Sequence, residues 1–260
     1  MNFLEEGILQ AFGLYLVRTS ALVLAAPVFS TGSSFTGYRI GLIFILSGIL
    51  FLSGGEALLE VPGPMEYALL AGREVVIGLS LAFVLHTVIL AIKVAGNMVG
   101  QEMAFNTANQ SDPVSGVSTP ILAFMYEALF MLALLSVDGH LWMVRALSES
   151  YARAPVGELV LDDGVSVLAT RLFSNMFSAG LTFAAPVFVL LALISILIGF
   201  LARAVPQVNV MEFGFSARIM AGFVGLLIFA PLIEPASQML LGALMDGLNT
   251  SLDALEVSGG

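Results

Sequence analysis

Six long runs of apolar residues constrain this chain more than any other feature of its sequence. They cover residues 8–29, 38–52, 67–95, 120–137, 181–201 and 213–233. A helix needs about 20 apolar residues to cross the roughly 30 Å of hydrocarbon in a bilayer, and most of these runs reach that length. The run 38–52 reaches it only with Phe35 and Ser53 included. The sequence therefore predicts an all-α, polytopic membrane-type protein.

Charged residues are too scarce to cover a surface that faces water. They make up 11% of the chain, while hydrophobic residues make up 58%, and a typical soluble domain carries about 25% charged residues. The net charge of −10 argues against nucleic acid as a partner, because phosphates must be neutralised by lysine and arginine. The chain has no cysteine, and its two histidines lie far apart. We expect no metal and no cofactor.

The segments outside these runs give a weaker indication of topology. The acidic N-terminus lacks the basic residues of a cleaved signal, so we expect the first apolar helix to be retained. Basic residues mark alternate connections and favour an N-terminus on the side of the membrane away from the cytoplasm. The longest connection, residues 138–173, breaks this alternation with three arginines. Residues 239–255 form an amphipathic stretch that we expect to pack rather than to cross the membrane.

A short motif occurs twice inside apolar runs. The five residues AAPVF stand at positions 25–29 and again at 184–188. A true inverted repeat is typical of transporters, so an ion-coupled secondary transporter is one interpretation of this repeated motif. Five residues from so apolar a composition also match by chance. Pro27 and Pro186 should each bend or break their helix, because proline removes a backbone donor.

Several ionisable side chains fall inside the apolar runs, and they are Arg18, Arg73, Glu74, His86, Lys93 and Glu127. Such a group costs about 2.5–3.5 kcal/mol at the centre of a membrane helix unless it finds a partner. One interpretation is a path for protons or ions. We favour the other, pairs between subunits or groups near a water-filled face, because a pump usually shows a denser line of carboxylates at mid-helix. His140 beside Asp138 lacks the nucleophile or metal partner of an intramembrane enzyme.

The segment 97–119 is the most polar stretch between two apolar runs. Its non-helical backbone around Asp112-Pro113 would leave amide groups unsatisfied in lipid, so we expect it in water, in protein or along a cavity. A surface loop and a pore-lining or gating segment both fit this pattern.

Four stretches of the chain carry a resemblance to a known family. They are LVRTSALVLAAPVFS at 16–30, VGQEM at 99–103 running on to Asp112-Pro113, DGHLWMVRAL at 138–147 with PVG at 155–157, and GFLARAVPQVNV at 199–210. With these stretches in this order, the chain resembles the FliR family of flagellar export-gate proteins, called SctT in virulence type III secretion systems. Its most specific element is Arg203 followed by Pro206, Gln207 and Asn209. We favour the flagellar branch and keep a virulence homologue as an alternative.

The resemblance implies a non-catalytic subunit of a larger helical gate in the bacterial inner membrane. Helical hairpins of this chain would pack with FliP and FliQ copies, next to FlhB and FlhA, in the flagellar basal body. Residues 1–160 would be FliP-like and residues 161–260 a FliQ-like hairpin with a C-terminal helix. The assembled channel would pass unfolded export substrates during flagellum assembly. Some of the six apolar helices would then lie in protein rather than in lipid.

The resemblance also implies roles for individual residues. The plug that closes the channel would lie within about 97–119 and include Met103, Phe105, Asn106, Thr107, Gln110, Asp112 and Pro113. Arg203, Pro206, Gln207 and Asn209 would shape a turn between helices and contact neighbouring subunits. This sequence departs from the family at 106–110, where relatives often carry aromatic residues, so its plug would hydrate more readily. It also has Ser216 where we expect proline.

Overall fold

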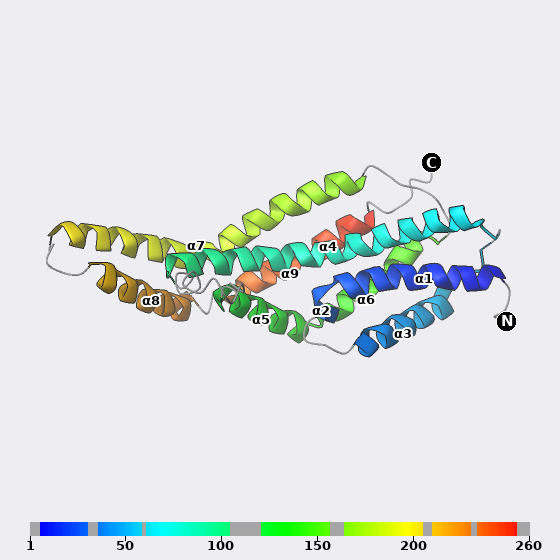
Figure 1. The fold of residues 1–260 in the computed structure, drawn as a ribbon, viewed down its shortest axis with the longest axis horizontal. Helices are drawn as coiled ribbons and strands as arrows, with labels where there is room; N and C mark the ends of the chain where they lie inside the picture. Colours follow the sequence, from blue (N-terminus) through cyan, green and yellow to red (C-terminus); the bar gives the residue numbers. More distant parts are fainter. Residues whose placement is uncertain are drawn as a thin grey trace, which may run out of the picture. The chain divides into compact units, whose positions relative to one another are not determined.

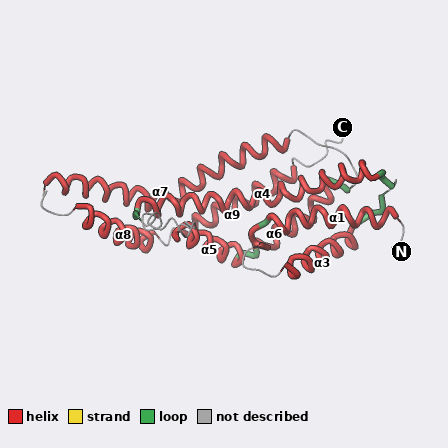
Figure 2. Tube along the Cα trace, in the orientation of Figure 1, coloured by secondary structure: helices red, strands yellow, loops and turns green. Residues whose placement is uncertain are grey.

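A computed structural model of the chain describes residues 6–30, 36–58, 61–104, 121–156, 164–204, 210–229 and 233–253. Within these ranges the backbone forms helices and connecting loops, and no strand is present (Figure 2). The helices are α1 (Glu6–Ala25), α2 (Pro27–Ser30), α3 (Thr36–Gly54), α4 (Pro64–Glu102), α5 (Ile121–Ser136), α6 (Gly139–Arg153), α7 (Gly164–Ala204), α8 (Val210–Phe229) and α9 (Ile233–Asp253). The predicted all-α fold is confirmed.

The described helices include four stretches long and apolar enough to cross a membrane. These are α1 from Gly7, α3 from Gly37, all of α4, and the part of α7 from Ala184 to Ala204. Helices α5 and α6 make a fifth if they count as one span, although the pair is bent by 69°. The apolar part of α8, Phe213–Ile228, is shorter. The polytopic membrane class is confirmed, and two of the six predicted spans, those at α5 and α8, are short when taken alone.

Helix α4 extends beyond its predicted ends. It begins at Pro64, a position where the missing N–H of proline is harmless, and it runs on through Asn97 and Gln101 to Glu102. The first six residues of the predicted polar segment 97–119 are therefore helical. The helix is followed by Ala104 with φ of 58°, a left-handed conformation that stops an α-helix.

The two prolines of the repeated motif behave differently. Helix α1 ends at Ala25, and the short helix α2 begins at Pro27, so the first proline breaks its helix. Pro186 lies inside α7, which continues on both sides of it. We expected each proline to bend or break its helix, and the break at Pro27 agrees with this. No break occurs at Pro186. The two copies of the motif do not share one local structure, which weakens the case for a repeat.

The chain divides into two compact units, and neither is continuous in sequence. Unit 1 comprises Met1–Thr87, Asp138–Leu172 and Ala243–Gly260, and unit 2 comprises Val88–Val137 and Phe173–Gly242. Helices α4, α7 and α9 supply residues to both units. The expected division at residue 160 concerns likeness to two other subunits, so it stays a prediction.

The core of unit 1 lies between α1, α3, α6 and the first part of α4. Helices α1 and α3 run side by side (Figure 1), and their contact includes edge-on packing of Phe51 against Phe12 and Tyr15. Gly78 lets α4 approach α1 closely, since a Cβ there would stand 2.5 Å from the carbonyl oxygen of Arg18. A small residue at such a crossing is typical of packed membrane helices.

The core of unit 2 gathers around the end of α4. Its buried residues come from α4, from the residue directly after it, and from α5 and α7. They are Ala95, Val99, Met103, Leu122, Ala184, Val187 and Leu191. Gly96 brings α4 against α5, because a Cβ at that position would lie 2.8 Å from the backbone nitrogen of Ala123. Gly225 of α8 faces Leu190 of α7 in the same way, at 2.8 Å.

Candidate functional site

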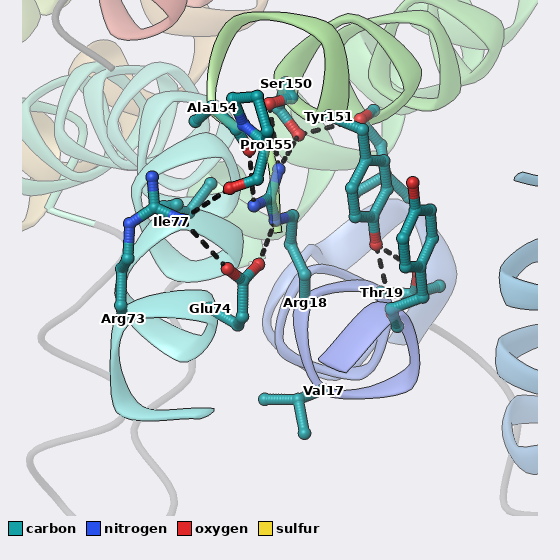
Figure 3. A network of polar contacts seen from close by, with 12 residues as sticks. Val17, Arg18, Thr19, Arg73, Glu74, Ile77, Ser150, Tyr151, Ala154 and Pro155 are labelled. Atoms are coloured by element: carbon teal, nitrogen blue, oxygen red, sulfur yellow. Dashed lines mark hydrogen bonds and ion pairs between the residues drawn. The ribbon is translucent and has the colours of Figure 1, made fainter. Parts of the chain in front are cut away.

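A buried network of charged groups ties three helices of unit 1 together. Arg18 of α1 and Glu74 of α4 are both fully buried, and the Nε of Arg18 donates to the Oε2 of Glu74 at 2.5 Å. The same guanidinium donates to the carbonyl and the hydroxyl of Ser150, at 2.8 and 3.1 Å, and to the carbonyl of Ala154 at 2.9 Å. Figure 3 shows Arg18 reaching between Glu74 and the end of α6.

A second arginine approaches Glu74 from its other side. The Nη1 of Arg73 donates to the Oε1 of Glu74 at 3.1 Å and to the carbonyl oxygen of Pro155 at 2.9 Å (Figure 3). One carboxylate is therefore shared by two guanidinium groups. The three side chains carry a net positive charge, because two cations oppose one anion.

The excess positive charge faces the C-terminus of α6. The carbonyls of Ser150, Ala154 and Pro155 lie in the last turn of that helix and just beyond it. The carbonyl of Ser150 also accepts from the backbone N–H of Ala154, whereas most backbone oxygens at a helix C-terminus lack partners within the helix. Aligned peptide dipoles give this end about half a negative charge. The two arginines therefore cap α6 electrostatically as well as by hydrogen bonds, and they fix its end against α1 and α4.

Aromatic side chains close the other side of the network. Tyr151 stacks on Tyr15 with ring centroids 4.1 Å apart, and the guanidinium of Arg18 lies 4.2 Å from the Tyr151 ring centroid. The Tyr151 hydroxyl donates to the backbone carbonyl of Tyr15 at 3.0 Å and lies 3.2 Å from the Thr19 hydroxyl. Stacking and a cation over a ring both favour this arrangement.

This geometry suits a structural contact that holds helices together better than it suits an ion path. Arg18 and Glu74 have no exposed side-chain surface, and each is held by several short contacts. The partner of Arg18 lies 56 residues away in the same chain, whereas the sequence analysis favoured a pair between subunits. In the described part of the chain, no group of three His, Asp or Glu residues is placed to hold a metal ion.

Glu127 takes part in a separate ion pair in unit 2. Its Oε1 lies 2.9 Å from the Nζ of Lys93, and this pair links α5 to α4. The side chain of Glu127 is 20% exposed and that of Lys93 is 42% exposed. Glu127, expected among the buried polar groups, is thus partly buried.

Met103 lies in the core of unit 2, fully buried. Its side chain fills the space beside Gly222 of α8, where an added Cβ would stand 2.5 Å from the Met103 sulfur. In this position Met103 packs between the end of α4 and α8, and its predicted role in the plug stays a prediction. The other plug residues expected from the resemblance, Phe105, Asn106, Thr107, Gln110, Asp112 and Pro113, lie outside the described residues.

The structure describes one member of the predicted turn between helices. Arg203 stands in the last turn of α7 and is exposed. A basic residue at this position complements the negative end of the helix dipole. Pro206, Gln207 and Asn209 lie outside the described residues.

Sequence reasoning missed the partners that complete the buried network. Ser150 and Tyr151 belong to a polar connection that gave no sign of burial, and Gly78 was one of 26 glycines. The one available signal was charge balance. Arg18 and the Arg73-Glu74 pair each stood inside an apolar run, and ionisable groups in such runs generally pair with one another.

Long apolar helices, close helix crossings and a solvent-free ion network define a polytopic helical membrane protein. The chain belongs to the family described as bacterial export proteins, family 1, which matches residues 9–244.

Several curated proteins named flagellar biosynthetic protein FliR are similar to this chain. The chain is 28% identical to the flagellar biosynthetic protein FliR of Escherichia coli strain K12 over 232 residues, covering 89% of this chain and 88% of the relative. It is 29% identical to FliR of Bacillus subtilis strain 168 over 225 residues, 84% of this chain and 85% of the relative. It is 29% identical to FliR of Pectobacterium carotovorum over 245 residues, which cover 93% of this chain and 92% of the relative. The resemblance to the FliR family is confirmed.

Proposed function

We propose that this chain is a subunit of the flagellar type III protein export gate in the bacterial inner membrane. The observation that carries the proposal is the family match over residues 9–244, together with relatives named flagellar biosynthetic protein FliR that align along most of their length. Helices able to cross a bilayer support an inner-membrane location.

The chain acts as one part of a helical channel built with FliP and FliQ copies, next to FlhB and FlhA. Large exposed apolar side chains support an assembly of this kind, since they need lipid or protein around them. In α3 they include Ile45 and Leu52, and in α8 they include Met220 and Leu227. The channel passes unfolded flagellar export substrates, and the chain itself catalyses no reaction.

The two halves of the sequence resemble different partner subunits in this proposal. Residues 1–160 correspond to a FliP-like part, and residues 161–260 to a FliQ-like hairpin followed by a C-terminal helix. The antiparallel packing of α8 against the later part of α7 supports the second assignment, because Gly214 lies beside Ile198 and Gly225 beside Leu190, as in a hairpin.

Closure of the channel is assigned to the segment that follows α4. Met103 anchors the end of the helix in the core of unit 2, and the residues from Phe105 to Pro113 form the plug. Arg203, Pro206, Gln207 and Asn209 shape the connection after α7 and contact neighbouring subunits.

Co-expression with FliP and FliQ tests the assembly. The chain is expected to co-purify with both proteins in one complex of fixed stoichiometry. A chain that behaves as a free monomer when all three are present contradicts the proposal. Loss of swimming motility on deletion of its gene, restored by a plasmid copy, separates a flagellar role from a virulence system, in which effector secretion is lost and motility is kept.

Ion flux through the assembled complex tests the plug. Replacing residues 105–113 by a short glycine-serine linker is expected to raise ion leakage across membranes that contain the complex. The exposed Gly72→Ala change in α4 serves as a control that leaves the leakage at its original level. Unchanged leakage after removal of the segment contradicts the assignment.

A further inference from the structure

The C-terminal end of α6 lies level with the middle of a candidate membrane span, the stretch Gly7–Ala25 of α1. The hydroxyl of Tyr151 donates to the carbonyl of Tyr15 at 3.0 Å. The guanidinium of Arg18 donates to the carbonyl of Ala154 at 2.9 Å (Figure 3). Tyr15 and Arg18 are the ninth and twelfth of the 19 residues of that span. These contacts fix the level of α6 within unit 1.

The exposed side of α6 carries charge at this level. Glu149 and Arg153 form an ion pair of 2.6 Å across one helical turn, and Arg153 also pairs with Asp253 at the end of α9. The side chains of Glu149 and Asp253 are 47% and 67% exposed. Ala152, next to Arg153, is exposed as well. We call these four residues the polar surface of unit 1.

Helix α3 gives unit 1 an apolar surface at the same level. Phe51 packs edge-on against Tyr15, with ring centroids 5.4 Å apart, while Tyr151 stacks on Tyr15 at 4.1 Å. Phe51 of α3 and Tyr151 of α6 are therefore level with each other. Beside Phe51 along α3, Ile49 is 59% exposed and Leu52 is 72% exposed. Unit 1 thus exposes hydrocarbon on α3 and ion pairs on α6 at one level of α1.

The two surfaces require different surroundings. Charged side chains in the hydrocarbon of a bilayer are costly, and in membrane proteins they face the interior of the assembly or a water-filled cavity. Lipid therefore suits Ile49 and Leu52 and does not suit Glu149 or Asp253. If α1 spans the bilayer, the polar surface lies at the depth of the hydrocarbon but is not in contact with it.

Water suits the polar surface better than a partner subunit does. Arg153 is already shared by Glu149 and Asp253 within this chain, so its charge needs no partner from outside. An ion pair between residues four apart is typical of a helix face in water, whereas the centre of a protein interface is depleted of charged residues. Water also solvates the half-exposed carboxylates, which outnumber the one cation between them.

We propose that the polar surface of unit 1 lines a water-filled passage at the level of the middle of α1, with the apolar side of α3 turned away from that passage. This inference rests on the export-gate function proposed above for the nature of the passage, through which an unfolded chain moves. Internally paired charges give the wall a wetted surface without a strong net charge. Such a surface offers no apolar patch to which an unfolded substrate would bind.

Thiol labelling tests the proposal, because the chain has no cysteine of its own. Ala152→Cys and Ile49→Cys place one thiol at a time on the exposed sides of α6 and α3, in the complex co-expressed with FliP and FliQ. A charged maleimide is added to opened membranes, where it reaches both faces of the bilayer but not the hydrocarbon. Ala152→Cys is expected to react at least about tenfold faster than Ile49→Cys, since apolar surroundings suppress the thiolate and one unit of thiol pKa changes its amount about tenfold. Equal labelling of both variants after denaturation in sodium dodecyl sulfate is the control.

Several results overturn the proposal. Equal labelling of the two variants in the intact complex removes the difference between the two surfaces. Labelling of Ala152→Cys in the chain expressed alone, but not in the complex, shows that a subunit covers α6. Failure of the wild-type chain to assemble with FliP and FliQ counts against the export-gate function instead. The chain alone is then labelled in membranes, where an unreactive Ala152→Cys overturns the wetted surface.

A stalled substrate separates the passage from water elsewhere. Membranes are prepared from cells in which an export substrate fused to a stably folded domain is stalled. Labelling of Ala152→Cys is expected to be lost there and to return when the substrate is absent. An unchanged labelling rate places the water outside the passage and overturns the proposal.

Added charge gives an independent measurement at the same two positions. Ala152→Lys is expected to leave the amount of complex at the wild-type level, because its ammonium group enters water. Ile49→Lys is expected to lower that amount by more than about tenfold, because it places a cation in apolar surroundings. Equal losses for the two lysine variants overturn the proposal.

Discussion

Arg18 of α1 and Glu74 of α4 form a fully buried ion pair, with 2.5 Å between the guanidinium Nε and the carboxylate Oε2. The pair lies at the C-terminal end of α6, whose carbonyls accept the remaining hydrogen bonds of Arg18. Three helices far apart in sequence are thereby joined at one point. Removing a single member leaves uncompensated charge in the core, and the first prediction follows from this.

Glu74→Gln is expected to destabilise the protein by about 3–5 kcal/mol, because Arg18 and Arg73 would then be buried without an anion. Thermal denaturation of the purified protein in detergent measures the effect. Glu127→Gln is the matched control, since its pair with Lys93 is partly exposed, and exposed pairs contribute about 0–1 kcal/mol. Equal effects of the two changes would show that the buried network does not hold unit 1 together.

Close approach of α1 and α4 at Gly78 gives a second prediction. Gly78→Ala is expected to lower the stability by about 1–3 kcal/mol, since the new methyl group would stand 2.5 Å from the Arg18 carbonyl oxygen and 2.7 Å from the Cβ of Ala21. Gly72→Ala is the control on the same helix, where an added Cβ meets nothing within 4 Å. Alanine stabilises a helix more than glycine does, so Gly72→Ala should be neutral or stabilising by up to about 1 kcal/mol. Thermal denaturation of the two variants checks this prediction, and a midpoint for Gly78→Ala equal to or above that of Gly72→Ala would contradict it.

The apolar runs predicted the helices well because burial in lipid or protein demands unbroken hydrophobic stretches. Their ends were less predictable. Polar residues such as Asn97 and Gln101 did not stop α4, since a polar side chain on a helix is tolerated wherever that face meets water or protein. Pro186 did not end α7 either. In a membrane helix, neighbouring groups can satisfy the carbonyl that a proline leaves free.

The buried network could be predicted only in part. Arg18 and Glu74 were recognisable as costly charges in apolar runs, but nothing in one sequence says which charges meet across 56 residues. Ser150 and Tyr151 were less visible still, because a polar connection gives no sign that its backbone carbonyls will accept from a distant arginine. Such contacts arise from tertiary packing, and a pattern along one helix does not encode them.

The hydroxyl of Tyr151 supplies a third prediction. Tyr151→Phe removes the bond to the Tyr15 carbonyl and the contact with the Thr19 hydroxyl, and it is expected to cost about 1 kcal/mol. Tyr151→Leu also removes the stacking on Tyr15 and the ring beside Arg18, which should add about 1–3 kcal/mol. Chemical denaturation in mixed micelles measures both variants. A larger loss for Tyr151→Phe than for Tyr151→Leu would contradict the role given to the ring.

Met103 and Gly222 give the last prediction, which concerns the anchor at the end of α4. Met103→Ala leaves a cavity in the core of unit 2 and is expected to cost about 2–5 kcal/mol. Gly222→Ala places a methyl group against the Met103 side chain and is expected to cost about 1–3 kcal/mol. In the double variant the new methyl group fills part of the cavity, so the combined loss should fall below the sum of the single losses. Gly199→Ala, with open space around it, is the control that should be additive with Met103→Ala. If Met103 instead lines the closed channel, Met103→Ala would raise ion leakage through the complex and leave the stability unchanged.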